Sequence, residues 1–418
     1  MTTPTVVLLG TLDTKGVEYG YVRDRLLAEG VAVLLVDAGI LDAPKATPDV
    51  TREEVAHAAG AELRDLIARG DRGEAIATMA RGAGEIVARL HAEGRLHGVL
   101  ALGGSGNATL ASQAMRRLPV GVPKLLVTTV AAGDTRPYVG TTDLTLMYSV
   151  VDVAGINRLS ARVLTNAAGA IAGMARTAAG FVATAESKPL IGATMFGVTT
   201  KGVTAARKRL EELGYEVLVF HATGVGGDTM ESLVESEYIT AVLDMTTTEL
   251  ADDLAGGVLA AGPRRLEVAG ERGIPQVVSL GALDMVNFGP IESVPPRYAG
   301  RRLYKHNATV TLMRTNPEEN AELGRRIAAK LNRARGPLTL FVPLRGVSAI
   351  STPGGVFADP EADAALVAAL REHLDPRVDA RYLDTDVNDP AFARAMADTL
   401  HAHYQAWSPS RATAGGRG

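Results

Sequence analysis

Residues 6–16 (VVLLGTLDTKG) decide the fold of this chain, because a near copy of them returns at residues 190–202 (LIGATMFGVTTKG). Each copy is an apolar run followed by a short polar loop that ends in Thr-Lys-Gly. An amphipathic stretch follows each copy, stops at Gly30 or Gly214, and leads into a second apolar run. This order is the pattern of a βαβ unit. The sequence therefore predicts two duplicated halves that each begin with strand, helix and strand.

The repeat continues along both halves. Residues 99–102 precede a Gly/Ser/Thr loop, as residues 242–245 precede a Thr-rich loop, and residues 145–147 parallel residues 311–313. Strands that alternate with helices in this way favour parallel sheets with ligands bound at the strand ends. We expect an α/β fold of two doubly wound, Rossmann-like domains related by internal duplication, with a ligand cleft between them.

The domain boundaries follow from a loss of helical periodicity at residues 181–189, the predicted linker. We expect a nucleotide-binding domain at residues 1–183 and a substrate-binding domain at residues 184–405. The last residues, 406–418, are rich in Ser, Ala, Gly and Arg, which predicts a disordered tail.

Composition excludes several classes of function. The 418 residues carry a formal net charge of −4 without a basic stripe, which argues against nucleic acid as a partner. The apolar runs fall short of the roughly 18 residues of a membrane span, so we expect a cytoplasmic protein with no membrane partner. The absence of cysteine excludes disulfides, thiolate nucleophiles and cysteine-bound metals.

A glycine-rich loop is the strongest candidate site of the first half. It follows a predicted buried strand and opens a predicted helix, where free backbone N–H groups and the helix dipole attract phosphate. A tight strand–helix turn is the alternative reading. The residues of this candidate nucleotide site are Gly103, Gly104, Ser105, Gly106 and Asn107.

Other polar residues of the first half also stand at strand ends. Lys15 could neutralise a phosphate, and Asp13, beside Thr14, could hold Mg²⁺ directly or through water; an Asp N-cap with a solvated lysine is the alternative. Asp37 stands where dinucleotide folds place a ribose-binding acid, or it is a turn residue. Two further residues complete the predicted cofactor-binding set, Thr129 and Arg158.

The second half places titratable residues at its strand ends. We expect a catalytic set that provides general acid–base chemistry or metal ligation, with His221 as the general base and Asp244, Glu249 and Asp284 beside it. For each residue alone, a capped loop is the alternative. The predicted substrate-binding residues are Lys201, Thr223, Gly224, Thr246, Thr247, Asn287, His306 and Arg314.

Several longer motifs, in order, resemble the UPF0261 family, which is the Tm-1-like ATP-binding family. They are TLDTKG at 11–16, GGSGN at 103–107, SVVDVAGINR at 149–158, FHATG at 220–224, DMTTTEL at 244–250 and GALDMVNFG at 281–289. The resemblance implies two α/β domains, binding of ATP and Mg²⁺, and a homo-oligomer, a dimer or a tetramer. It also implies a Pro-Cys pair where this chain has Lys201-Gly202, so Lys201 adds a cation.

Three hypotheses about function remain open. The chain is an ATP-dependent enzyme, ligase-like or kinase-like, that acts on a small acidic or carbonyl-containing molecule. Alternatively, it is a nucleotide-binding regulator without turnover. In the third hypothesis it is an ATP-independent, metal-assisted hydrolase or lyase.

Overall fold

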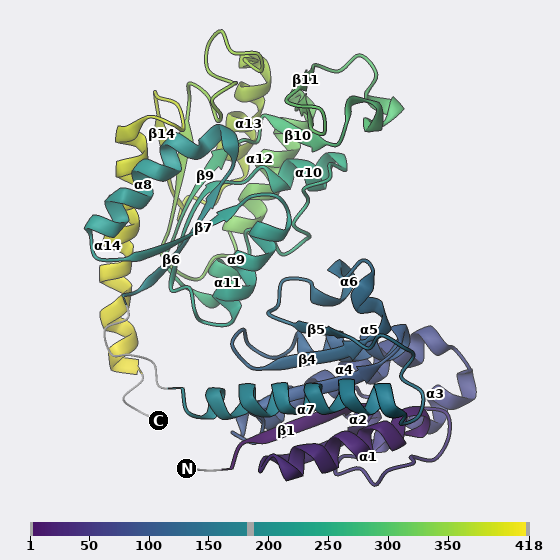
Figure 1. The fold of residues 1–418 in the computed structure, drawn as a ribbon. Helices are drawn as coiled ribbons and strands as arrows, with labels where there is room; N and C mark the ends of the chain where they lie inside the picture. Colours follow the sequence, from purple (N-terminus) through teal and green to yellow (C-terminus); the bar gives the residue numbers. More distant parts are fainter. Residues whose placement is uncertain (1–2, 182–187, 415–418) are drawn as a thin grey trace. The chain divides into compact units, whose positions relative to one another are not determined.

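The computed structural model describes residues 3–181 and 188–414, and the side chains up to residue 407 (Figure 1). Two compact units divide the chain: unit 1 lies before residue 182 and unit 2 after residue 187. The predicted linker at 181–189 falls largely on residues 182–187, which lie outside the described residues.

The sheet of unit 1 is parallel, with strand order β2-β1-β3-β4-β5. Its strands are β1 (Thr5–Gly10), β2 (Ala32–Asp37), β3 (Gly98–Gly103), β4 (Lys124–Thr128) and β5 (Thr145–Tyr148). The order changes direction between β1 and β3, because β2 lies on one side of β1 and the later strands lie on the other. This point is the topological switch point of a doubly wound sheet, where such folds bind their ligands.

Helices cover both faces of this sheet (Figure 1). On β1, Val6 and Leu8 pack with α1 (Leu12–Ala28) and α7 (Arg158–Ala179), whereas Val7 and Leu9 pack with the helices of the other face. Successive side chains of a strand point to opposite faces, so a strand covered on both sides must be apolar throughout. The helices of the other face are α2 (Arg52–Ala58), α3 (Leu63–Arg69), α4 (Arg72–Ala92) and α5 (Ser105–Met115). The short helix α6 (Arg136–Val139) precedes β5.

The sheet of unit 2 repeats this order and extends it. It runs β14-β13-β9-β8-β6-β7 and is parallel throughout. Its strands are β6 (Leu190–Met195), β7 (Glu216–His221), β8 (Ala241–Thr246), β9 (Gln276–Gly281), β13 (Leu338–Pro343) and β14 (Asp379–Leu383). The run β7-β6-β8-β9 matches β2-β1-β3-β4, and β6, α8 (Thr200–Glu212) and β7 form the predicted strand–helix–strand. The predicted duplication of the α/β fold is therefore confirmed.

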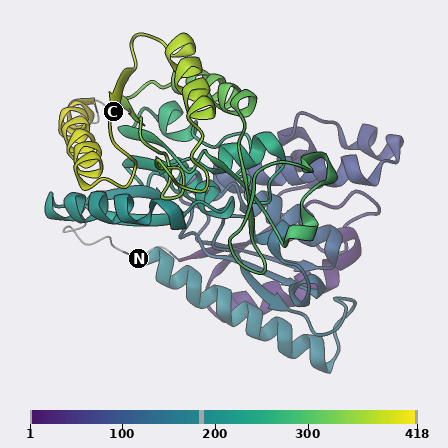
Figure 2. The same cartoon turned by 90° about the horizontal axis from the view of Figure 1, so that it is seen from above.

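Helices also cover both faces of the second sheet. On one face, α8 and α14 (Pro390–Ala414) pack together and lie side by side in both views (Figure 1, Figure 2). The helices of the other face are α9 (Val225–Glu235), α10 (Glu249–Ala255), α11 (Val268–Arg272), α12 (Pro317–Leu331) and α13 (Pro360–His373). Short 3-10 turns lie at Thr129–Ala132, Gly197–Thr199, Ile291–Ser293 and Pro296–Tyr298. No helix in the described part of the chain is long and apolar enough to cross a membrane.

One predicted element of the repeat is wrong. Residues 145–147 belong to β5, a parallel strand at the edge of the first sheet, but residues 311–313 belong to β12 (Thr311–Arg314). That strand is the middle strand of a small antiparallel sheet, between β10 (Met285–Phe288) and β11 (Leu303–Lys305). A short apolar run does not specify its partner strand, so two similar runs can pair differently.

The predicted tail also differs from the structure, because α14 continues to Ala414. Trp407 packs against the apolar cluster around Met230 and Val234, and its ring centroid lies 5.9 Å from that of Tyr404. This packing anchors the helix beyond residue 405, and Ala and Arg favour its continuation. The rest of the predicted tail, residues 415–418, lies outside the described residues.

The repeated Thr-Lys-Gly stretch lies in the first turn of α1 and of α8 rather than in a loop. Its glycine allows another segment to pack closely on the helix. A Cβ atom on Gly16 would lie 2.8 Å from Cβ of Lys45, and one on Gly202 would lie 2.4 Å from the carbonyl oxygen of Val387. The duplicated motif therefore preserves a packing contact in both units.

This contact predicts opposite effects for two substitutions in α1. Gly16→Ala should lower the free energy of unfolding by about 1–3 kcal/mol, because the added methyl group overlaps the backbone near Lys45. Gly20→Ala meets nothing within 4 Å and should leave stability unchanged or raise it by up to about 1 kcal/mol. Urea unfolding of both variants checks this, and equal effects would contradict the packing explanation.

Candidate functional site

The candidate site is a cavity of about 490 Å³ within unit 1. It lies at the carboxyl ends of β1, β2 and β3, where Thr11, Ala38 and Gly104 line it. These strands flank the switch point of the sheet, so the cavity occupies the place where a doubly wound fold is expected to bind a ligand.

The helix α5 begins at the wall of this cavity. Gly104 is its N-cap and provides no side-chain cap, and within the described chain the N–H groups of Ser105, Gly106 and Asn107 have no acceptor. Gly103 has a φ of 151°, and a Cβ atom on it would lie 2.9 Å from Cβ of Asn107. The glycine-rich stretch therefore turns the chain sharply and leaves a helix N-terminus exposed to the cavity, which favours an anion.

Asn107 lines the cavity and carries a buried hydrogen-bond acceptor that has no partner among the described residues. Its side-chain NH₂ donates to the carbonyl oxygen of Leu102 (2.7 Å) and to the hydroxyl of Tyr19 (3.1 Å). Its Oδ1 has no hydrogen-bond partner, although the residue is only 8% exposed. A buried acceptor without a partner is unfavourable, so a donor on a ligand or a bound water would stabilise this position.

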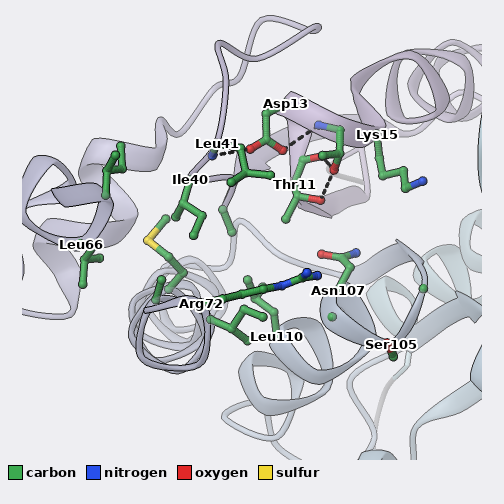
Figure 3. Close-up of a pocket in the computed structure, with 18 of the residues that line it drawn as sticks. Thr11, Asp13, Lys15, Ile40, Leu41, Leu66, Arg72, Ser105, Asn107 and Leu110 are labelled. Atoms are coloured by element: carbon green, nitrogen blue, oxygen red, sulfur yellow. Dashed lines mark hydrogen bonds between the residues drawn. The ribbon is translucent and has the colours of Figure 1, made fainter. Parts of the chain in front are cut away.

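Arg72 supplies a positive charge at the same place. The residue begins α4, and its guanidinium extends into the cavity between Thr11 and Asn107 (Figure 3). A Cβ atom on Gly106 would lie 3.4 Å from Nη2 of Arg72, and within the described residues Arg72 has no ion-pair or hydrogen-bond partner. No sequence motif indicates Arg72, because only the fold brings the start of α4 to the start of α5.

Lys15 and Asp13 line the cavity as predicted but are already engaged. The Lys15 ammonium donates to the carbonyl oxygen of Val153 and points away from Arg72 (Figure 3). The Asp13 carboxylate accepts from the N–H groups of Thr14 (2.6 Å) and Leu41 (2.8 Å). Asp13 thus ties the start of α1 to the segment that follows β2.

Other predicted cofactor residues lie outside the cavity lining. Asp37 accepts from the N–H groups of Leu12 (3.0 Å) and Gly39 (2.9 Å), and burial raises the pKa of its carboxyl. Thr129 lies behind Gly104, and Arg158 is exposed at the start of α7. Thr14, Gly104, Ser105, Gly106 and Asn107 do line the cavity, whereas Asp37, Gly103, Thr129 and Arg158 do not.

Aliphatic side chains form the opposite half of the cavity. They come from the segment after β2 and from helices α3, α4 and α5, which no local motif connects. The apolar lining residues are Ile40, Leu41, Leu66, Ile67, Ile76, Met79 and Leu110.

In unit 2, Asp244 and Glu249 form a buried ion-pair network instead of lining an open pocket. The Arg265 guanidinium donates to Oδ1 of Asp244 (2.7 Å) and to Oε2 of Glu249 (2.6 Å). Arg265 is 1% exposed and lies 3.4 Å from the carboxylate of a third acid, Glu231. Sequence analysis missed Arg265, which is separated from these acids along the chain. A solvent-accessible catalytic pair requires exposure that these residues lack.

In the glycine-rich loop of unit 2, a carboxylate side chain of the protein binds the backbone N–H groups. Oε1 of Glu249 accepts from the N–H groups of Gly224 (2.8 Å) and Gly227 (3.0 Å), at the start of α9. The hydroxyl of Thr223 donates to the carbonyl oxygen of His221. An internal carboxylate therefore takes the position that an anionic ligand would need.

Hydroxyl groups fill the switch point of unit 2. The hydroxyls of Thr246 and Thr199 lie 2.8 Å apart, and Thr247 donates to the carbonyl oxygen of Ser279. Thr194 donates to Asp244 (2.7 Å). The predicted substrate residues Thr246 and Thr247 are thus buried within the fold.

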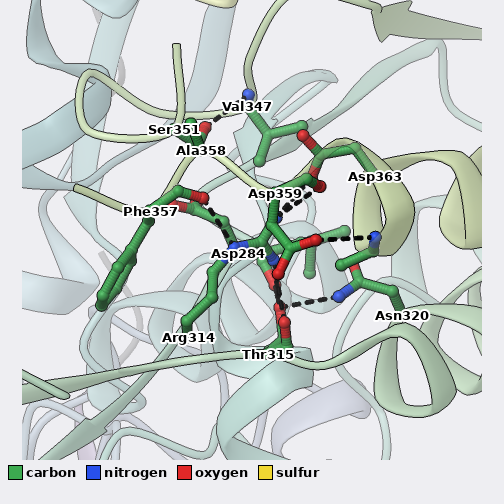
Figure 4. Close-up of polar contacts among 12 residues, drawn as sticks. Asp284, Arg314, Thr315, Asn320, Val347, Ser351, Phe357, Ala358, Asp359 and Asp363 are labelled. Atoms are coloured by element: carbon green, nitrogen blue, oxygen red, sulfur yellow. Dashed lines mark hydrogen bonds and ion pairs between the residues drawn. The ribbon is translucent and has the colours of Figure 1, made fainter. Parts of the chain in front are cut away.

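The remaining predicted residues of unit 2 are not gathered around one pocket. His221 is exposed at the end of β7, with its ring centroid 5.5 Å from that of Phe196. Lys201 and His306 are exposed on α8 and beyond β11, and Asn287 donates to the carboxylate of Asp252 (2.7 Å). Asp284 and Arg314 lie together in a separate polar cluster (Figure 4). The predicted catalytic and binding roles stay predictions, but the structure does not bring this set together within unit 2.

The fold and the cavity define a two-unit, doubly wound α/β protein with a switch-point cavity in unit 1 that has a polar end and an aliphatic end. Family models match both units: the N-terminal domain of the Uncharacterised protein family (UPF0261) matches residues 4–180, and its C-terminal domain matches residues 188–404. The chain therefore belongs to the UPF0261 family, which confirms the resemblance seen in the sequence.

Relatives agree with this assignment. A UPF0261 protein of Clostridium tetani is 53% identical over 396 residues, which cover 94% of this chain and 98% of the relative. The ToMV resistance protein Tm-1 of Solanum lycopersicum is 46% identical over 334 residues, which cover 79% of this chain and 44% of the tomato protein. A UDP-N-acetylglucosamine 2-epimerase of Rickettsia bellii is 12% identical over 66% of this chain and 79% of its own, with a TM-score of 0.23, too low to guide interpretation.

The buried network of unit 2 predicts a pH dependence of stability. Burial raises the pKa of Glu231 to about 7, against the opposing effect of Arg265, whereas the unfolded chain releases this proton near 4.5. Between these values the folded state holds a proton that the unfolded state has lost. The contribution of Glu231 to stability therefore falls as the pH rises from about 4.5 to about 7.

Urea unfolding at pH 5 and pH 7.5 tests this, with Glu231→Gln as the variant. The amide does not titrate. The free energy of unfolding of the variant should therefore fall less between the two pH values than that of the parent chain. Glu235→Gln is the control, because Glu235 lies on the same helix but is about half exposed. A Glu231→Gln variant with the full pH dependence of the parent would contradict the assignment.

Proposed function

We propose that unit 1 binds a nucleoside triphosphate, ATP, together with Mg²⁺. The observation that carries the proposal is the uncapped start of α5, which opens into a cavity that also holds Arg72, a cation with no partner among the described residues. An unpaired cation beside free N–H groups is an arrangement that favours an anion.

The terminal phosphates would accept hydrogen bonds from the N–H groups of residues 105–107. Arg72 would add a charge-assisted bond, because its fork of N–H donors matches phosphate oxygens. Lys15 would contribute only if it left the carbonyl oxygen of Val153, so it is secondary to Arg72 in this proposal.

The nucleoside would occupy the aliphatic half of the cavity. A volume of about 490 Å³ lies within the range of pockets that hold ligands of this size. Leu66, Met79 and Leu110 would provide apolar surface for a base.

Mg²⁺ would be held mainly through phosphate oxygens and water. Among the described residues, no group of three or more His, Asp or Glu side chains is arranged to bind a metal ion. Mg²⁺ often binds proteins through one or two carboxylates together with substrate phosphates. Asp13, whose oxygens each accept one N–H group, keeps further lone pairs for a water of the ion.

The use made of the nucleotide separates two versions of the proposal. In the first, the chain transfers a group from ATP to a small acidic or carbonyl-containing molecule. In the second, it is a nucleotide-binding regulator without turnover, and the burial of Asp244 and Glu249 favours this version because it removes two predicted catalytic acids from solvent. Measurement of steady-state ADP or AMP release with candidate acids distinguishes them.

The role of Arg72 gives a direct test of the phosphate position. Arg72→Gln should weaken ATP binding at least about tenfold, or roughly 1.4 kcal/mol, because it removes the cation beside the phosphates. The affinity for adenosine, which has no phosphate, should stay nearly unchanged. Calorimetric titration of both ligands checks the two expectations together.

Arg64→Gln is the matched control, because Arg64 is exposed on the neighbouring helix α3 and does not line the cavity. It should bind both ligands like the parent chain. Failure of the parent chain to bind ATP would contradict the proposed function, and an equal loss for ATP and adenosine in Arg72→Gln would move the phosphates elsewhere.

A further inference from the structure

A second cavity, of about 710 Å³, lies within unit 2 and shares no residue with the first. Its walls are the segment 344–360, which follows β13, and the outer side of α13. Leu280, Val347 and Leu366 provide buried aliphatic surface in its lining. The cavity thus combines an apolar floor with a position at the carboxyl edge of the sheet.

The segment that encloses this cavity is held by its own hydrogen bonds. Oγ of Ser351 accepts from the N–H groups of Val347 and Ser348, both at 3.0 Å. The N–H of Phe357 donates to the carbonyl oxygen of Ile350 (2.8 Å). A connection of this length without regular structure often has a functional role, and these bonds make it a preformed wall.

Two carboxylates belong to the lining. Asp363 accepts from the Arg314 guanidinium (2.5 Å), and Asp359 accepts from the N–H of Ala362 at the start of α13. The side chain of Asp363 is 33% exposed and that of Asp359 is 25% exposed. Burial raises the pKa of Asp363 in spite of Arg314, so its anionic form lacks full compensation.

A further acid lies behind this wall and is connected to it. Oδ2 of Asp284 accepts from the hydroxyl of Ser348 (2.8 Å), whose Oγ lies 3.3 Å from that of the lining residue Ser351. In the part of the chain that the structure describes, Oδ1 of Asp284 has no partner, and the residue is 1% exposed. Burial raises the pKa of Asp284 to about 6, although Arg314 opposes the shift. Figure 4 shows this cluster, with Asp284 and Arg314 beside Asp359 and Asp363.

The cations of the lining are bound to other partners. Arg345 donates twice to Asp384, at 2.6 Å each, and the Arg371 guanidinium lies 4.5 Å from the centre of the Tyr382 ring. Of the cations near the acidic cluster, Arg314 is buried in it and Arg302 approaches Asp359 only to 3.9 Å. The contact of Arg371 with a ring does not neutralise its charge, so the three carboxylates Asp284, Asp359 and Asp363 are balanced in formal charge by Arg302, Arg314 and Arg371. Within the lining, Asp359 and Asp363 remain partly exposed hydrogen-bond acceptors.

We propose that this cavity is a second small-molecule site, for an aliphatic amine whose ammonium group binds Asp359 and Asp363. Its hydrocarbon body would lie on Leu280, Val347 and Leu366. The proposal goes beyond nucleotide binding and does not depend on it, because the two cavities are in different units.

Three four-carbon probes that differ only in head group test the proposal: butylamine, butyrate and 1-butanol. Methyl NMR of the full chain, with labelled Leu and Val, reports on Val347 and Leu366. Butylamine should shift these methyl signals and bind at least about fivefold more tightly than either other probe. Asp363→Asn should remove this preference. Glu372→Gln, which alters an exposed acid on the same helix outside the lining, should retain it.

Val367→Phe gives a second test that leaves the ion pairs intact, because Val367 lines the cavity and the larger ring would fill it. This variant should lose the butylamine shifts, and thermal unfolding verifies that each variant is folded. Equal binding of butyrate or 1-butanol, or unchanged preference in folded Asp363→Asn, would overturn the amine assignment. Absence of shifts with all three probes at saturating concentrations would overturn the site itself.

Discussion

The candidate site depends on the hydrogen bonds of the Tyr19 hydroxyl. It donates to the carbonyl oxygen of Leu9 (2.5 Å) and accepts from the N–H of Leu102 (3.0 Å) and from Asn107 (3.1 Å). It thereby joins α1 to the ends of β1 and β3 and orients the first turn of α5. Burial raises the pKa of Tyr19, so the hydroxyl keeps its proton and its donor role. Gly10 makes room for it, since a Cβ atom there would lie 2.0 Å from the phenol oxygen.

The two copies of the fold differ in what lies at their switch points. In unit 1 the start of α5 is open to a cavity, and Arg72 adds a charge that has no partner among the described residues. In unit 2 the corresponding point is filled by threonine hydroxyls, and Asp244 is neutralised by Arg265. Removal of one partner from such a buried ion pair is strongly destabilising, so these residues are explained by stability. One copy of the fold therefore has an open cavity at the point where the other has a buried polar core.

The sequence was sufficient for the α/β class, the duplication and the glycine-rich start of α5, because these depend on local patterns of apolar and glycine residues. It was not sufficient for Arg72, which reaches the site from another helix, or for Arg265, which withdraws Asp244 and Glu249 from solvent. The predicted pairing of residues 311–313 was wrong for the same reason, since a short apolar run does not identify its neighbouring strand. Local patterns predict elements, whereas long-range packing decides which polar side chains remain accessible.

The proposed position of the nucleotide phosphates is the start of α5. Backbone amide NMR of the full chain, titrated with ATP and Mg²⁺, tests this position most directly, because the N–H groups of Ser105, Gly106 and Asn107 would become hydrogen-bonded. We expect these amides to show the largest shifts in unit 1 and adenosine to leave them nearly unchanged. If saturating ATP leaves the three amides unchanged while it shifts residues elsewhere, phosphate binding at α5 is wrong.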